Sequence, residues 1–208
     1  MDIPKDVYQG AGVLMSYEDD IILGIRLDKD GKETGEIEYI GGWKEDGEIP
    51  SQTAFNELVE ESGQVILDAD WHDRATALYT FVQMWIWCFH VPLTDQEYAH
   101  VVQAHKELKK WDPHTTRSFK DITGRDEPAR KGIAGFVSVP KKTFVNLVTE
   151  FHRMPPTKNR MTDAKKFGQD NRLLVKAVDG VSMPSTYALR GFNAVIFETH
   201  SEKIKEIF

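Results

Sequence analysis

Three glutamates, Glu57, Glu60 and Glu61, are spaced so that an α-helix would place them on one face. Ser51 is the predicted N-cap residue of that helix, and Gly63 is the predicted residue at its C-terminal end, with left-handed backbone. Like charges so close destabilise a bare helix, whereas Mg²⁺ or Mn²⁺ takes carboxylate oxygens as ligands. For the helix alone, an ordinary solvated acidic face is the commoner alternative.

The loop before this helix favours a metal site over an ordinary solvated acidic face. Gly41 and Gly42 follow a predicted strand, 37–40, and Gly47-Glu48 forms a second turn before the helix. A glycine pair lets the backbone approach a ligand closely, and the Gly42 carbonyl oxygen can then serve as a metal ligand. The loop and the helix together therefore favour a divalent-cation site.

The stretch that ends at Gly63 resembles the Nudix box, a motif of glycines and glutamates at fixed spacing. The positions that match are Gly42, Glu48, Glu57, Leu58, Glu60, Glu61 and Gly63. Two positions depart from it: Asn56 stands where the family has arginine, and Gln64 stands where it has an apolar residue. The box covers 23 of the 208 residues.

The resemblance implies an α/β fold, a Nudix-type α/β/α sandwich with a mixed sheet, and a hydrolase that acts on diphosphate bonds. It implies that Glu57, Glu60 and Glu61 bind Mg²⁺ or Mn²⁺, with the Gly42 carbonyl as a further ligand. A metal there neutralises the diphosphate and lowers the pKa of the attacking water. Glu57 and Glu60 are expected to be catalytic, and Glu57 or a later carboxylate accepts the water's proton. Glu127, in a loop ahead of a predicted strand, is the candidate for that later carboxylate, and a solvated loop charge is its alternative.

Asn56 bears on whether the site is active. In the family, the arginine pairs with acidic groups of the loop and helix and holds the catalytic glutamate in place. Asparagine can donate one hydrogen bond but cannot form a bidentate pair, so Glu48 is expected to lose its partner. Either another basic residue substitutes, with Lys44 and Arg26 as the candidates, or catalysis is weakened.

Arg26, Trp43 and Lys44 are the candidate substrate-binding residues. Arg26 ends a predicted strand, and the hairpin before the box would bring it near the substrate, although a plain surface position is an equal alternative. Trp43 lies beside the glycine pair, where an aromatic ring could stack on a base.

The elements fit one domain, 1–208, built around these residues. The predicted strands are 10–15, 21–26, 37–40, 65–67, one or two within 75–91, 133–139 and 192–197. The predicted helices, besides the box helix, are 94–110, 141–153, 163–178 and a short one at 201–208. The segment 94–130 is a helical insertion that could cap the substrate cleft. The segment from about 155 to 208 is a C-terminal extension that completes the sandwich, forms a dimer interface or binds substrate beyond the diphosphate.

The composition is that of an ordinary globular protein, with 40% hydrophobic and 28% charged residues and a net charge of −7. The single cysteine, Cys88, lies in an apolar run and predicts core packing in a reducing compartment. No signal pattern or membrane-spanning apolar run is visible, so we expect a cytoplasmic protein with no membrane partner.

Three functions remain open. The leading one is cleavage of a nucleoside diphosphate linked to another group, with ADP-ribose-like or nucleotide-sugar substrates favoured and a nucleoside monophosphate released. The second is mRNA decapping, in which the basic segment 131–176, with ten basic and three acidic residues, would hold capped RNA, although a solvated surface explains that segment more simply. The third is a weakened, Nudix-like nucleotide-binding protein, which Asn56 would explain. A homodimer is an expectation from the family.

Overall fold

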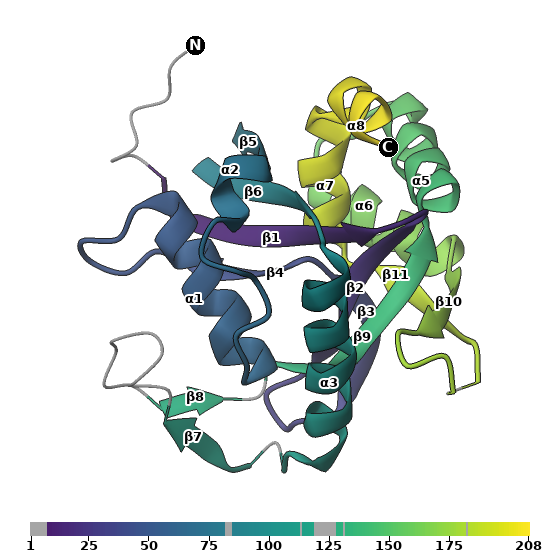
Figure 1. The fold of residues 1–208 in the computed structure, drawn as a ribbon. Helices are drawn as coiled ribbons and strands as arrows, with labels where there is room; N and C mark the ends of the chain where they lie inside the picture. The colour runs from purple at the N-terminus through teal and green to yellow at the C-terminus, as the bar shows by residue number, and fades with distance from the viewer. Residues whose placement is uncertain (1–7, 82–84, 113, 119–127, 131, 182) are drawn as a thin grey trace.

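A mixed β-sheet forms the centre of the protein, seen in a computed structural model that describes residues 8–208 except 82–84, 113, 119–127, 131 and 182 (Figure 1). The sheet of the described residues has nine strands in the order β3-β11-β10-β9-β2-β1-β6-β5, with β4 paired to β1. The strands are β1 (Gly10–Tyr17), β2 (Asp20–Leu27), β3 (Glu33–Glu38), β4 (Ile40–Trp43), β5 (Thr76–Phe81), β6 (Trp85–Pro92), β9 (Ile133–Pro140), β10 (Leu173–Ala177) and β11 (Ser185–Leu189). A separate two-stranded sheet pairs β7 (Thr116–Ser118) with β8 (Pro128–Arg130).

Five strands of the large sheet pair in a closed circuit. The pairs β2–β3, β11–β10, β10–β9 and β9–β2 are antiparallel, and β11–β3 is parallel. Because β3 pairs with both β2 and β11, this end of the sheet curls back on itself. The circuit brings β11, late in the chain, beside β3, which leads into the glycine loop.

Helices cover both faces of the sheet (Figure 1). They are α1 (Pro50–Ser62), α2 (Trp71–Arg74), α3 (Asp95–Lys110), α5 (Lys141–Arg153), α6 (Arg160–Asp170), α7 (Gly191–Thr199) and α8 (Ser201–Ile207). Buried residues of α1 and α3 share one hydrophobic cluster, whereas buried residues of α5 to α8 share another. Helices on both faces of a mixed sheet confirm the predicted α/β/α sandwich.

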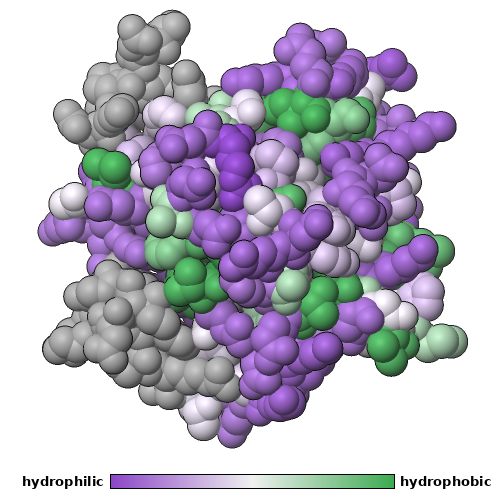
Figure 2. Space-filling view, viewed as in Figure 1, coloured by the Kyte–Doolittle hydropathy of each residue, from purple (hydrophilic) through white to green (hydrophobic). Residues whose placement is uncertain are grey.

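The strand pattern explains why the two clusters lie on opposite faces. In β2, Ile21 and Leu23 pack with the C-terminal helices, whereas Ile22 packs with α1 and α3. Side chains of a strand alternate between faces, so the continuous apolar run Ile21 to Leu23 serves two cores. The outer face drawn in Figure 2 is mostly hydrophilic, with hydrophobic residues in small separate patches.

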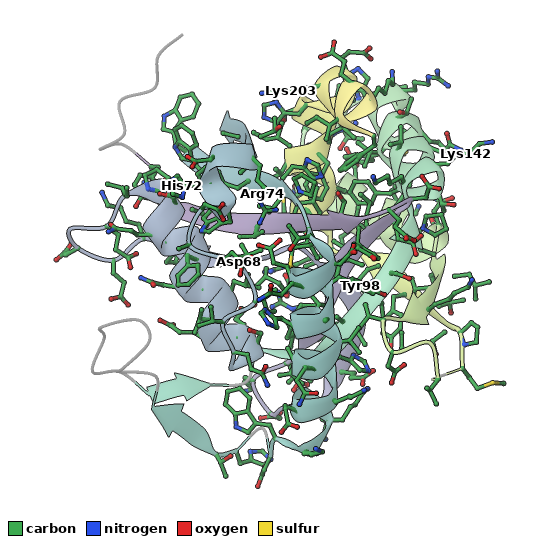
Figure 3. All side chains as sticks on the ribbon, in the orientation of Figure 1. Asp68, His72, Arg74, Tyr98, Lys142 and Lys203 are labelled. Carbon is green, nitrogen blue, oxygen red and sulfur yellow. The ribbon has the colours of Figure 1, made fainter. Side chains whose placement is uncertain are left out.

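Helix α3 begins and is anchored as its sequence predicts. The Thr94 hydroxyl accepts a hydrogen bond from Glu97 N, and the Glu97 carboxylate accepts one from Thr94 N, which is a capping box. Glu97 also accepts hydrogen bonds from Asp68 N and from Arg74, whose side chains are labelled in Figure 3. Tyr98 stacks on Tyr17 with ring centroids 4.0 Å apart. These contacts fix α3 to the segment between α1 and β5 and to the end of β1.

Three predicted elements were wrong. Residues 65–67 form no strand, and the predicted helix 163–178 is α6 followed by strand β10. The predicted strand 192–197 is helix α7, because Ala194 to Phe197 is a continuous apolar run that fits either a buried helix or a buried strand. In the part of the chain that the structure describes, no helix is long and apolar enough to span a bilayer.

Arg160 fastens α6 to its neighbours. Its guanidinium pairs with Glu198 of α7, donates to the Phe151 carbonyl oxygen over 2.7 Å, and stacks on the Phe151 ring at 3.9 Å. Arg160 and Glu198 have side-chain exposures of 17% and 19%, so removal of one leaves a poorly solvated charge.

We expect Arg160→Gln to lower the free energy of unfolding by about 2 kcal/mol, because it leaves Glu198 and a buried carbonyl short of donors. Urea unfolding measures the change. Arg153→Gln, on the exposed face of α5, is the control and should be near neutral. Equal stability of the two variants would show that α6 does not depend on this ion pair.

Candidate functional site

The glutamate-bearing helix α1 packs on β1 and β4 through Ala54, Leu58 and Val59. It begins two residues earlier than predicted, with Ile49 as N-cap and Pro50 as first residue, so Ser51 is not the cap. Proline is favoured at this position because its missing N–H would be unpaired anyway. Gly63 ends the helix with φ of 72°, which confirms the predicted left-handed stop.

Glycines allow two of the glutamates to lie against the backbone. A Cβ atom added to Gly42 would lie 2.4 Å from the Glu57 carboxyl carbon, so this carboxylate occupies the space that a side chain would fill. A Cβ atom added to Gly132 would lie 2.6 Å from Glu61 Cγ. The fold therefore brings Glu57 onto the glycine loop, as the sequence predicted for a shared metal site. Glu60 lies partly exposed on the same helix.

Charge is concentrated around Glu61. Burial raises the pKa of Glu61 well above its usual range, and the carboxylates of Glu38 and Glu57 raise it further, whereas Arg190 and Arg26 lower it. A group of carboxylates that repel one another gains from a bound cation. Glu57, Glu61 and the Gly42 carbonyl thus fit a hard divalent cation in their chemistry.

The described side chains do not form a complete set of metal ligands. Across the described residues, no three His, Cys, Asp or Glu side chains come together closely enough to hold a metal ion. Glu127, the candidate for a later carboxylate, lies outside the described residues. Metal binding by Glu57, Glu60, Glu61 and Gly42 therefore stays a prediction.

Glu38 was missed in the sequence, although the structure places it at the centre of the site. It is 7% exposed at the end of β3, pairs with Arg190, and lies 3.4 Å from Arg26 Nη1. An acidic residue just before a glycine loop, alternating with buried Ile37, was the signal available. Arg26 also lies 4.0 Å from Glu36, and its predicted role in substrate binding stays a prediction.

Glu48 keeps partners despite the loss of the arginine. Asn56 Nδ2 donates to Glu48 Oε1 over 2.6 Å, and the Thr53 hydroxyl donates to Oε2 over 2.6 Å. Asn56 thus makes the one hydrogen bond that its amide was expected to offer, and Thr53 adds a second. Lys44 is not the substitute either, because its ammonium lies over the Tyr8 ring, 4.7 Å from the centroid. Two neutral donors on the helix, Asn56 and Thr53, thus help to anchor Glu48, together with Glu45 N of the loop, which donates to Glu48 Oε2 over 3.2 Å.

A cleft of about 930 Å³ opens beside the glycine loop. Its lining residues are Arg26, Glu36, Glu38, Tyr39, Gly41, Gly42, Trp43 and Ile86 from the strands, and Asn159, Met161, Thr162, Lys165, Arg190, Gly191 and Asn193 from the C-terminal extension. Trp43 is 63% exposed at this cleft, as a stacking residue should be. No described residue of α3 lines it, and Lys44 lies outside the lining, whereas residues of the C-terminal extension form part of its wall.

The comparisons with known proteins give structural matches alone. No protein-family model and no curated protein matches this sequence. Among solved structures, the chain is similar to a mutT/nudix family protein from Listeria innocua, with 12% identity and a TM-score of 0.38 over 99% of this chain and 98% of that chain. A NUDIX hydrolase from Nitrosomonas europaea gives 14% identity and a TM-score of 0.36 over 71% and 82%.

A third similar structure is a bifunctional NMN adenylyltransferase/ADP ribose pyrophosphatase from Francisella tularensis, complexed with AMP and a manganese ion. It is 16% identical with a TM-score of 0.33, and the match covers 43% of this chain and 28% of that chain. This chain thus spans little more than a quarter of the Francisella protein. The solved structures that it is similar to include two named for the family that the box at Gly42 to Gly63 resembles.

The hydrogen bond from Asn56 to Glu48 generates a prediction about the loop at residues 44–49. We expect Asn56→Ala to lower the free energy of unfolding by about 1 kcal/mol and to speed tryptic cleavage after Lys44, because Glu48 loses a partly buried donor. Denaturation and limited proteolysis measure the two effects. Gln103→Ala, an exposed change on α3, is the control, and equal cleavage rates in both variants would contradict the anchoring role.

Proposed function

We propose that this chain, which resembles Nudix hydrolases, is a metal-dependent pyrophosphohydrolase that cleaves a nucleoside diphosphate linked to another group and releases a nucleoside monophosphate. The observation that carries the proposal is the Glu57 carboxylate lying against Gly42 at the edge of a large cleft. Acidic and basic side chains meet there, as hydrolysis of a charged diphosphate requires. The expected metal is Mg²⁺ or Mn²⁺.

In this proposal, Glu57, Glu60 and Glu61 hold the metal with the Gly42 carbonyl. The metal, when bound, withdraws charge from phosphorus and makes water more acidic. Arg26 and Arg190 face the cleft, where their guanidinium groups balance the negative oxygens of the diphosphate. Water forms a bond to one phosphorus atom, the bridging P–O bond breaks toward the leaving phosphate, and a carboxylate accepts the water's proton. Glu57, Glu60 and Glu127 are the candidates for that carboxylate.

The favoured substrates are ADP-ribose-like compounds or nucleotide sugars. A cleft of about 930 Å³ is at the upper end of small-molecule sites and has room for a nucleotide joined to a second group. Trp43, exposed on one side of the cleft, would stack on the base, and Arg26 would contact the phosphates. Lys44 stays a weaker candidate for substrate binding, because it lies over Tyr8.

Removal of an mRNA cap is the alternative with one observation in its favour. Lys165 belongs to the basic segment 131–176 and lines the cleft, so that segment could hold an RNA chain that leaves it. RNA binding would weaken steeply with salt, because phosphate contacts release counterions. A nucleotide-binding protein without turnover is the third candidate, and the Asn56–Glu48 bond counts against it. The homodimer and the cytoplasmic location stay predictions.

Product release with Mg²⁺ or Mn²⁺ tests the proposal across ADP-ribose, NADH, nucleotide sugars, diadenosine polyphosphates, nucleoside triphosphates, a diphosphoinositol polyphosphate and capped RNA. We expect a chelator to abolish turnover, and added metal to restore it. Glu60→Gln and Glu61→Gln should each lower kcat on the order of 100-fold or more, because each removes a charge that holds the metal. Glu150→Gln, exposed on α5, is the control. Binding of a nucleotide without any turnover would overturn the hydrolase and favour the binding protein.

Trp43 allows a separate prediction on the base. Trp43→Ala should raise KM about fivefold with little change in kcat, because stacking contributes about 1 kcal/mol to ground-state and transition-state binding alike. Trp43→Phe keeps a stacking surface and should recover most of the affinity. An unchanged KM for Trp43→Ala would remove Trp43 from the substrate site.

A further inference from the structure

One carboxylate, that of Glu38, lies between two arginines at the cleft. Arg26 Nη1 lies 3.4 Å from Glu38 Oε2, and Arg190 Nη1 donates a hydrogen bond to the same oxygen. The side chain of Glu38 is 10% exposed, whereas those of Arg26 and Arg190 are 31% and 36% exposed. Two guanidinium groups thus converge on one largely buried carboxylate, and all three residues line the cleft.

The sheet brings these three side chains together from distant parts of the chain. Strand β3 carries Glu38 and pairs with β2 on one side, where Gly24 lies opposite Glu38, and with β11 on the other. The register of β2 shifts around Arg26 against both β3 and β9, an irregularity of the kind that re-aims a side chain. Arg190 directly follows β11, and its N–H donates to the Ile37 carbonyl oxygen over 3.0 Å. Backbone pairing therefore fixes the base of each arginine beside Glu38.

The charge of Glu38 allows the two guanidinium groups to stay close together. Like charges repel one another unless an opposite charge lies between them, and a largely buried carboxylate is screened less by solvent than a surface one. A guanidinium has five N–H donors, so it can bind a carboxylate oxygen and a phosphoryl oxygen at the same time. Neighbouring phosphoryl groups of a diphosphate are joined through one oxygen atom, so two adjacent guanidinium groups can each contact one of them.

Glu36 differs from Glu38, although it lies on the same strand and lines the same cleft. Its carboxylate lies 4.0 Å from Arg26 Nε, which is beyond hydrogen-bonding distance, and its side chain is 23% exposed. Removal of its charge would change the electrostatic field of the cleft but leave the bridge between the two arginines in place. Glu36 is therefore the matched control for the charge of Glu38.

We propose that Glu38 is a positioning residue that holds Arg26 and Arg190 as a pair, so that each guanidinium binds one of two neighbouring phosphoryl groups. This role rests on the proposed function in one respect, namely that the bound diphosphate belongs to the substrate. Glu38 acts through the two arginines and contacts neither the substrate nor the metal. The pair then selects a diphosphate over a monophosphate, and Arg190 gives the C-terminal extension a part in that selection.

Calorimetric titration of ADP and AMP into the metal-free protein tests this role, because the two ligands differ by one phosphoryl group. We expect the wild type to bind ADP at least about fivefold more tightly than AMP, and Glu38→Gln to reduce this ratio of affinities at least about threefold. Loss of a negative charge alone would raise the ratio, because ADP carries more negative charge than AMP. Glu36→Gln should accordingly keep the ratio or raise it.

Three results would overturn the positioning role. They are a ratio that is unchanged or raised in Glu38→Gln, an equal fall of the ratio in Glu36→Gln, and a wild type that lacks saturable ADP binding or does not prefer ADP. Partial unfolding of a variant would lower the apparent affinities for ADP and AMP alike, so it would leave the ratio unchanged.

Lysine variants of the two arginines give a second test that does not depend on the folding of Glu38→Gln. Arg26→Lys and Arg190→Lys keep the positive charge but lose the planar fork of donors, and both side chains are partly exposed. We expect each change to lower the ratio of ADP to AMP affinity about threefold. A wild-type ratio in both variants would overturn the paired arrangement.

The affinities are measured without turnover, so this role and the hydrolase can fail separately. A wild type that hydrolyses no substrate, with the expected ratios, would overturn the hydrolase and leave Glu38 as the residue that positions a diphosphate-binding pair. A wild type that hydrolyses its substrate, with the same ratio in Glu38→Gln, would overturn the positioning role and leave the hydrolase.

Discussion

Crowded carboxylates must be balanced by positive charge, and this requirement connects the two ends of the chain. The negative charges of Glu57 and Glu38 raise the pKa of Glu61 on α1, and the guanidinium groups of Arg26 and Arg190 lower this pKa. Arg26 comes from the hairpin before the glycine loop, whereas Arg190 comes from the C-terminal extension. The acidic site is therefore sustained by residues from three separate parts of the sequence, and a divalent cation would complete the balance.

The C-terminal extension is part of the site as well as of the core. Phe167, Leu173, Leu189 and Phe197 lie in the same hydrophobic cluster as the inner face of β2, so the extension cannot leave without exposing the sheet. Strand β11 pairs with β3 and delivers Arg190 directly beside Glu38. The same packing that stabilises the sandwich thus fixes part of the wall of the cleft.

Asn56 shows how a changed motif residue keeps a structural role. A guanidinium could pair with two acidic groups at once, whereas the Asn56 amide and the Thr53 hydroxyl each donate one hydrogen bond to Glu48. Neutral donors of α1 thus take part in anchoring the loop where the family motif has an arginine. Positive charge instead reaches the site from Arg26 and Arg190, on the side of the cleft where a diphosphate would lie.

The sequence by itself determined the elements whose signals are local. The glutamate spacing and Gly63 predicted α1, Thr94 and Glu97 predicted the start of α3, and the apolar hairpin predicted β1 and β2. Only the tertiary structure decided that 192–197 is a helix, because a short apolar run satisfies a buried helix and a buried strand equally. Only the tertiary structure showed that Arg190 donates a hydrogen bond to Glu38, 152 positions earlier in the chain, and that Tyr39 N donates one to Asn193, 154 positions later. Local backbone geometry sets the spacing of residues within a helix, so this spacing can be read from the sequence. A cleft is made by side chains from distant parts of the chain that come into contact when the sheet forms. No local sequence pattern encodes these long-range contacts.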